Sequence, residues 1–233
     1  MTALLYRWPK AAEFGRVIPK TKFYEHTNIG WTVKDRFVSD VRRITWAYKL
    51  AEATIKIPGS SEVPEIQVFE IESKGEDVAE SVLGAIDRAV RTPIIFEIRR
   101  GEGADESVRM VGAHKQLDVG APKLGPYLST DWQPASVDRV PLPTAIDLAG
   151  MYTALLQPMT LVATRPGETL SEVVERLISV RSLQREITAL ERRLRNEPQL
   201  NRKVELRRTL KTKQAALVDL TRAAESPDTG KMN

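Results

Sequence analysis

The chain has 233 residues, enough for one sizeable core with an appendage or for two small domains. It has no cysteine, which excludes disulfides and thiolate metal sites. It also has no apolar run long enough for a membrane span and no signal-peptide pattern, so the sequence favours a cytoplasmic location. The net charge is only +4, but residues 170–225 hold 13 basic and 8 acidic side chains against 22 and 23 elsewhere, so any attraction to polyanions is expected there.

Basic and aromatic residues alternate along the first 30 positions. They are Arg7, Trp8, Lys10, Phe14, Arg16, Phe23 and Tyr24. The composition predicts an N-terminal arm whose aromatic side chains pack on the rest of the domain. The alternative is a stacking surface for single-stranded nucleic acid.

The next hundred residues alternate between helical and strand patterns. Phe37, Val41, Ile44 and Tyr48 recur at helical spacing and predict a helix over 32–53. A second helix is predicted over 78–90, and strands are predicted over 53–57, 65–73, 93–100, 107–117 and 126–132. Because short turns suit hairpins, we expect an α+β domain over residues 1–133 with a mostly antiparallel sheet packed on helices.

The C-terminal hundred residues change character twice. Residues 134–169 are rich in proline and predict a linker with one short helix over 145–157. From 170 to 225, apolar residues recur at spacings of three and four on both sides of Pro198, which predicts an antiparallel coiled-coil hairpin. Residues 226–233 are expected to be a flexible tail.

The stretch VFEIESK, residues 68–74, ends in Glu-x-Lys, a pattern found in metal-dependent nucleases. Strand alternation places six charged residues on one sheet face, which predicts a solvated ladder of opposite charges: Lys56, Glu70, Glu72, Lys74, Glu97 and Arg99. The alternative is a Mg²⁺-dependent nuclease of the PD-(D/E)xK kind, with Glu70, Glu72 and Lys74 as catalytic residues and Glu70, Glu72 and Glu97 as ligands.

Such a nuclease site also needs an acidic residue on the strand before Glu-x-Lys, and the sequence offers none at that place. The nearest match is Glu65, but Glu65 and Glu72 lie on one predicted strand and on opposite faces. At about 3.3 Å per residue they would be roughly 20 Å apart, so they would not share a metal ion. The sequence therefore favours a protein without a cofactor, with Mg²⁺ as the alternative.

Other catalytic chemistries lack their residues. His26 and His114 are the only histidines, so a zinc site has almost no ligands, and His114 is expected to be structural. Neither a phosphate-binding Gly-x-x-x-x-Gly-Lys-Ser/Thr loop nor a Gly-x-Ser-x-Gly elbow is present.

The predicted hairpin tip, residues 190–213, holds nine basic and three acidic residues. Such a tip suits contact with phosphates or docking on an acidic partner protein, unless it is merely solvated. The candidate contact residues are Arg192, Arg193, Arg195, Arg202, Lys203, Arg207, Arg208 and Lys211.

The order of several stretches resembles the bacterial domain-of-unknown-function family 4391. They are LLYRWPKAAEFGRVIPKTKFYE, RITWAYKLAEATI, EIQVFEIESK, AIDRAVRTPIIFEI, LPTAIDLAGMYTALL and NEPQLNRKVEL. The family has no established activity, so the resemblance implies no catalytic residue. It implies genes encoded near helicases, DNA methyltransferases and type III restriction-like subunits, and hence a role in DNA restriction or phage defence.

Together these patterns predict a non-enzymatic accessory subunit of a DNA restriction or phage-defence system. Its expected partners are a helicase, a methyltransferase or a restriction-type subunit, or DNA itself, bound through the basic hairpin. Homo-oligomers formed through the hairpin are a further possibility, and no membrane contact is expected.

Overall fold

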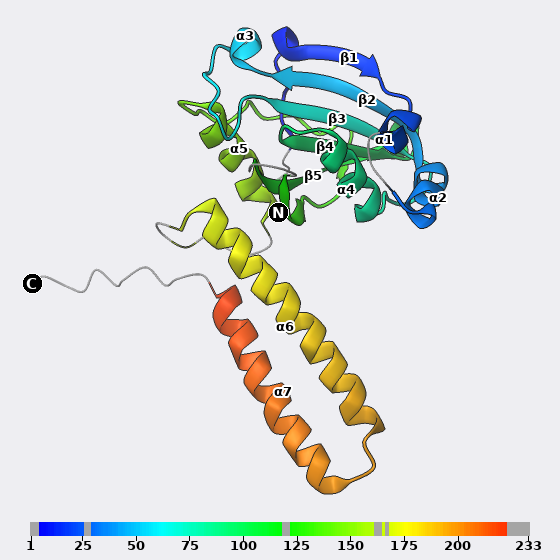
Figure 1. Ribbon diagram of the computed structural model, residues 1–233, viewed down its shortest axis with the longest axis vertical. Helices are drawn as coiled ribbons and strands as arrows, with labels where there is room; N and C mark the ends of the chain where they lie inside the picture. The colour runs from blue at the N-terminus through cyan, green and yellow to red at the C-terminus, as the bar shows by residue number, and fades with distance from the viewer. Residues whose placement is uncertain (1–4, 26–28, 118–121, 161–164, 166–167, 223–233) are drawn as a thin grey trace, which may run out of the picture. The chain divides into compact units, whose positions relative to one another are not determined.

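A computed structural model describes residues 5–25, 29–117, 122–160, 165 and 168–222 (Figure 1). The chain forms two compact units, Met1–Thr160 and Leu161–Asn233, called unit 1 and unit 2 below. The finer division at residues 133 and 169 stays a prediction, and the tail predicted over 226–233 lies outside the described residues.

Unit 1 is built on one mixed sheet. Its strands are β1 Glu13–Val17, β2 Val41–Leu50, β3 Ile66–Ser73, β4 Ile94–Arg100, β5 Ser107–Gln116, β6 Lys123–Ser129 and β7 Gln133–Pro134. They follow the order β1-β2-β3-β4-β5-β6, with β7 paired to β5, and only the β3–β4 pair is parallel. The predicted α+β fold with a mostly antiparallel sheet is therefore confirmed.

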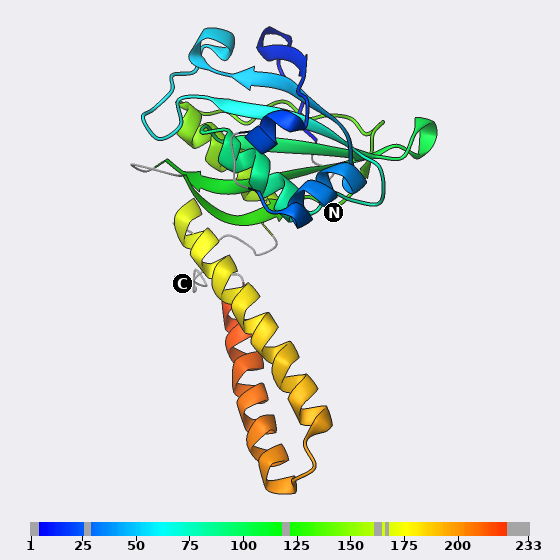
Figure 2. The ribbon, with the colours of Figure 1, turned by 45° about the vertical axis from the view of Figure 1, so that its right-hand side comes forward.

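Helices cover both faces of this sheet (Figures 1 and 2). They are α1 Thr21–Glu25, α2 Trp31–Asp40, α3 Glu52–Ile55, α4 Glu80–Ala89 and α5 Leu148–Leu156, with 3-10 turns at Lys10–Ala12, Gly103–Asp105 and Gln157–Met159. The main core lies where α1, α2 and α4 meet the sheet, around Phe37, Phe69, Ile86 and Phe96. On the opposite face α5 packs closely, since a Cβ at Gly112 would lie 2.6 Å from Leu156 Cδ2.

The helix predicted over 32–53 is wrong in its second half. It ends at Asp40, and the chain continues directly into β2. Register shifts between Val41 and Arg43 and between Trp46 and Tyr48 interrupt the alternation of β2. Buried positions then fall about three residues apart, which imitates a helical stripe although the β-branched and aromatic content favours a strand.

The strand predicted over 53–57 is also wrong. These residues form most of the one-turn helix α3, which ends at Lys56 in the left-handed region with φ 59°. Lys56 therefore lies off the sheet, and its amine donates to the Ala53 carbonyl. The short helix predicted over 145–157 is present as α5, and Asp147 caps it by accepting from the Gly150 amide.

Unit 2 contains two long helices, α6 Leu170–Asn196 and α7 Leu200–Thr221, which form the predicted hairpin. Thr169 and Glu172 cap α6 reciprocally, and an ion pair between Glu186 and Lys213 joins the two helices. Residues at positions 203, 206, 210, 213, 217 and 220 are half-buried, so the seam of α7 keeps a spacing of three and four. Supercoiling of the pair stays a prediction.

Candidate functional site

The Glu-x-Lys stretch lies at the end of β3. Of the six charged residues predicted to share one sheet face, Glu70, Glu72, Glu97 and Arg99 do so, whereas Lys56 and Lys74 lie outside the strands. In the parallel register Glu70 stands beside Glu97 and Glu72 beside Arg99. Glu72 pairs with Arg43 of β2, and Glu70 lies 3.6 Å from Arg99. The three candidate carboxylates thus stand among arginines.

Glu97 corrects the prediction that this face is solvated. Its side chain is fully buried because residues 5–8 and a segment near residue 139 cover the centre of the face. Arg139 binds both carboxylate oxygens, at 2.7 and 2.9 Å, and the Trp8 indole N–H donates at 2.6 Å. Arg139 also donates to the Tyr6 carbonyl at 2.7 Å, so one buried carboxylate holds two distant segments.

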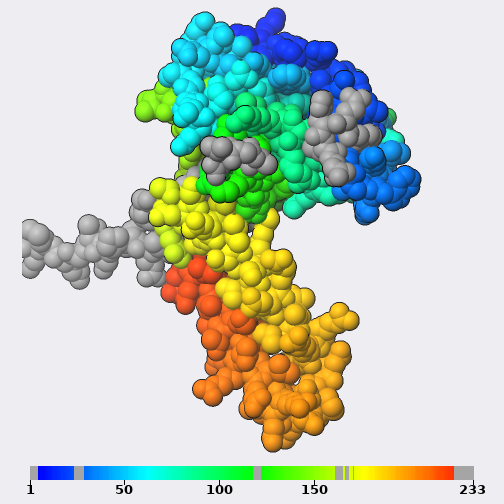
Figure 3. Space-filling model, in the orientation of Figure 1, coloured from blue at the N-terminus to red at the C-terminus, as the bar shows by residue number. Residues whose placement is uncertain are grey.

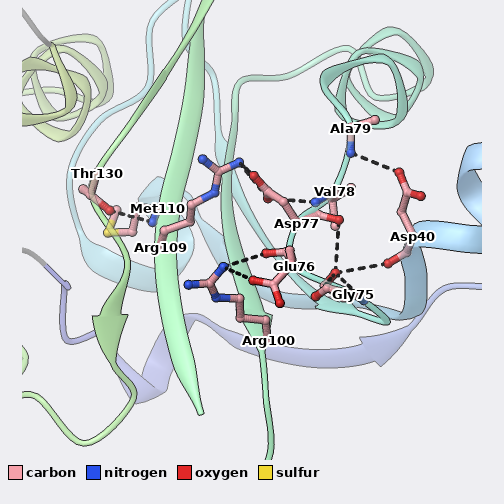
Figure 4. A network of polar contacts seen from close by, with 11 residues as sticks. Asp40, Gly75, Glu76, Asp77, Val78, Ala79, Arg100, Arg109, Met110 and Thr130 are labelled. Atoms are coloured by element: carbon pink, nitrogen blue, oxygen red, sulfur yellow. Dashed lines mark hydrogen bonds and ion pairs between the residues drawn. The ribbon is translucent and has the colours of Figure 1, made fainter. Parts of the chain in front are cut away.

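Lys74 points to the backbone rather than to the carboxylates. Its amine donates to the Val38 carbonyl at 2.7 Å, and its amide donates to the Asp40 carbonyl. Figure 4 shows the loop that follows, where Arg100 binds Glu76 and Arg109 binds Asp77. The residues after the Glu-x-Lys pattern are therefore fixed by ion pairs at the start of α4.

The described residues contain no group of three or more His, Asp or Glu side chains that could hold a metal ion. His114 lies on β5, where burial lowers its pKa, and His26 falls outside the described residues. The arginine partners of Glu70, Glu72 and Glu97 explain how three carboxylates share this face.

Replacing Glu70 by glutamine is expected to stabilise unit 1 increasingly as the pH rises. Burial raises the pKa of Glu70 above its ordinary value of 4.5, so the folded state retains a proton that the unfolded state loses. The wild-type free energy of unfolding therefore falls as the pH rises from 4.5 through the raised pKa of Glu70. The Glu70→Gln variant has no proton to lose there, so its free energy of unfolding does not fall for this reason. Between pH 4 and 8, the urea midpoint of Glu70→Gln should rise progressively above that of the wild type. A constant difference between the two midpoints across this range would contradict the prediction.

The hairpin tip presents the basic residues that the sequence singled out. Of the eight candidates, seven are exposed and Lys203 is half-buried at the seam. Within residues 168–222, none of these eight forms an ion pair with another described residue. Figure 3 shows the tip of α6 and α7 as a surface of protruding side chains. The cations there are thus available to an external anion.

A groove of about 950 Å³ lies along one side of the tip, between α6 and α7. Arg192, Arg193 and Arg202 line it, together with Glu197 and Glu205. Its other basic residue is Arg185, which the sequence prediction missed although it lies seven residues, or two helical turns, before Arg192.

The other five candidates lie outside the groove. They are Arg195, Lys203, Arg207, Arg208 and Lys211. The structure therefore gathers three of the eight predicted residues around one groove and spreads the rest over the tip.

None of the helices in the described part of the chain is long and apolar enough to cross a membrane. Searches of curated proteins and of solved structures find no significant match. The family model described as "Domain of unknown function (DUF4391)" matches residues 7–217, which is most of both units. The chain therefore belongs to the DUF4391 family.

Proposed function

We propose that the protein is a non-enzymatic accessory subunit of a bacterial DNA restriction or phage-defence system, and that its basic hairpin binds DNA in the cytoplasm. The restriction or defence role rests on the genes expected to accompany this family. The DNA-binding role rests on the unpaired cations of the hairpin tip.

The charge of the tip carries the proposal. Nine basic residues and three acidic ones lie within residues 190–213, and Lys213 is the basic residue among them with an ion-pair partner in the described chain. Each cation that neutralises a phosphate releases a counterion, which makes binding strong at low salt and independent of base sequence. The guanidinium groups of Arg192, Arg193 and Arg202 suit phosphate oxygens because they donate through a planar fork.

A second candidate is a partner protein, the helicase, methyltransferase or restriction-type subunit expected above. Leu200 is 72% exposed and Val204 is 57% exposed, one helical turn apart at the start of α7. An apolar spot beside a basic groove suits a protein surface that is partly acidic. Leu200→Ser with Val204→Ser should then abolish copurification with such a subunit and leave DNA binding intact.

Reversing the three groove arginines, as R192E/R193E/R202E in the full chain, should weaken binding to a duplex of about 20 base pairs at least tenfold at low salt. The dependence of log K on log salt should become shallower by about 2.7, at roughly 0.9 for each phosphate that is no longer neutralised. Fluorescence anisotropy at several salt concentrations measures both quantities. The melting temperature should change little, because the three residues are exposed.

The matched control is K10E/K34E/R91E, which changes the net charge equally at exposed positions of unit 1. This control should retain the wild-type salt dependence. A third variant, R207E/R208E/K211E, shows whether DNA also contacts the tip outside the groove. Equal losses in the groove variant and the unit 1 control would reject a localised DNA site.

A further inference from the structure

A second cavity lies within unit 1, on the sheet face that α1 and α4 cover. Its volume is about 640 Å³, within the range of small-molecule sites. It is lined by β1, α1, β2, β3 and the end of α4, and the hairpin contributes no residue to it.

Aromatic side chains form one wall of this pocket. Trp46 and Phe69 line it with their rings nearly parallel, at 9° and 5.9 Å between centroids. Phe14 of β1 packs against Trp46, with 4.3 Å between the ring centroids, and Phe23 of α1 also lines the cavity. Phe69 and Phe23 are buried, so the accessible flat surface of this wall belongs to the half-buried Trp46, and it suits a planar ring.

Hydrogen bonds fix the orientation of the indole. The Trp46 N–H donates to the Gln67 side-chain oxygen at 2.9 Å, and Gln67 is almost fully buried. The Gln67 amide in turn donates to Glu65 at 3.0 Å and to the Thr92 hydroxyl at 3.1 Å. This chain of bonds holds the wall in one arrangement before any ligand arrives.

The polar groups of the pocket differ between its two ends. Arg16 and Lys22, both exposed, supply positive charge from β1 and α1. Glu65 and Thr92 supply a carboxylate and a hydroxyl where β3 and β4 begin. Glu65 also pairs with Lys49 at 2.7 Å, yet each carboxylate oxygen accepts more than one hydrogen bond.

We infer that this pocket binds one nucleotide unit, either free or within a single strand. The base lies against Trp46, and its exocyclic amine donates to Glu65. The phosphate lies at Arg16 and Lys22. Carboxylates accept from the amino group of cytosine in the same way, and stacked bases on basic, aromatic surfaces are the usual form of single-strand recognition.

This inference goes beyond the proposed function, because it concerns unit 1 and needs no residue of the hairpin. It also gives a role to the basic and aromatic residues of the N-terminal thirty. Arg16, Phe14 and Phe23 meet at or beside the pocket, whereas Trp8 is used to bind Glu97.

Titration of the full chain with CMP and UMP tests the inference by calorimetry. The two ligands share the phosphate and ring size, but only cytosine carries an amine at the position that Glu65 would read. CMP should bind about tenfold more tightly than UMP, and Glu65→Gln should reduce this preference. A ten-nucleotide oligodeoxycytidylate, titrated into R192E/R193E/R202E so that the hairpin groove does not bind it, distinguishes the sources. Tighter binding of the oligonucleotide than of CMP identifies a single strand, and equal binding identifies free nucleotides.

Two variants locate the site. R16E/K22E should weaken CMP at least tenfold, whereas K10E/K34E, with the same charge change away from the pocket, should remain within about twofold. Ala89→Trp, which fills the cavity from α4, should abolish binding. Absence of saturable CMP binding to the wild type, or equal weakening of CMP by both charge variants, would overturn the inference. The hairpin variants leave CMP binding unchanged, so the two proposals fail separately.

Discussion

Replacing Glu97 by alanine should destabilise unit 1 by about 3–5 kcal/mol. The substitution leaves the Arg139 guanidinium, which is half-buried, without its bidentate partner, and the Trp8 indole N–H without an acceptor. Loss of the carboxylate also removes the acceptor that the Trp8 and Arg139 segments share. All four tryptophans lie in unit 1, so urea unfolding followed by tryptophan fluorescence reports on this unit.

Glu72→Ala is the matched control on the same sheet face. Glu72 is half-buried and its partner Arg43 is largely exposed, so the loss should be about 1 kcal/mol or less. The stability lost by Glu97→Gln should fall between the losses of Glu97→Ala and Glu72→Ala, because glutamine keeps the shape of the side chain and one hydrogen-bond acceptor. Equal losses for Glu97→Ala and Glu72→Ala would show that the buried network contributes no more than a surface ion pair.

Replacing Lys115 by methionine should destabilise unit 1 by a similar amount, about 3–5 kcal/mol. Lys115 is fully buried, and its amine lies within 2.9 Å of Asp87 Oδ1 and of the carbonyls of residues 87, 90 and 92. The Asp87 and Val90 carbonyls lie at the end of α4, so the lysine caps this helix from β5, and the Thr92 carbonyl lies in the turn that follows. Its removal takes this donor from the three carbonyls and leaves the buried Asp87 carboxylate without its counter-charge, although the Tyr127 hydroxyl still donates to it.

A double substitution separates the lost charge pair from the lost packing. Asp87→Asn removes the charge and keeps an acceptor for the Tyr127 hydroxyl, which donates to Asp87 at 2.5 Å. D87N/K115M should therefore cost less than the sum of the single changes, as a double-mutant cycle measures. Lys49→Met, which breaks the partly exposed pair with Glu65, should cost no more than about 1 kcal/mol. Additive losses at Asp87 and Lys115 would rule out the coupling.

Local patterns sufficed for the elements that depend on neighbouring residues. The hairpin follows from apolar residues three and four apart on either side of Pro198, and α4, β3 and β4 follow from short apolar runs. In α7 the pattern was incomplete because Lys203 and Lys213 occupy seam positions, and Lys213 is accommodated there by Glu186.

The remaining features depend on residues far apart in the sequence. β2 was mistaken for a helix because two bulges shifted its alternation, and a bulge is defined by the partner strand. Glu97 was placed on a solvated face because its covering residues, Trp8 and Arg139, lie 89 and 42 positions away. The pocket around Trp46 likewise combines five separate elements, so the sequence showed its residue types without their meeting point.

The N-terminal arm is the first part of unit 1 to be synthesised and the last to gain its partners. Tyr6 and the Arg139 that binds its carbonyl lie 133 positions apart, and the adjacent backbone bonds of Arg7 and Val140 close a loop of similar length. Closing so long a loop slows folding, whereas a helical hairpin needs only contacts between near neighbours. A nascent chain therefore exposes the sheet face around Glu97 until residues 139 and 140 have left the ribosome. A transcript truncated before that point encodes a protein whose Glu97 lacks Arg139.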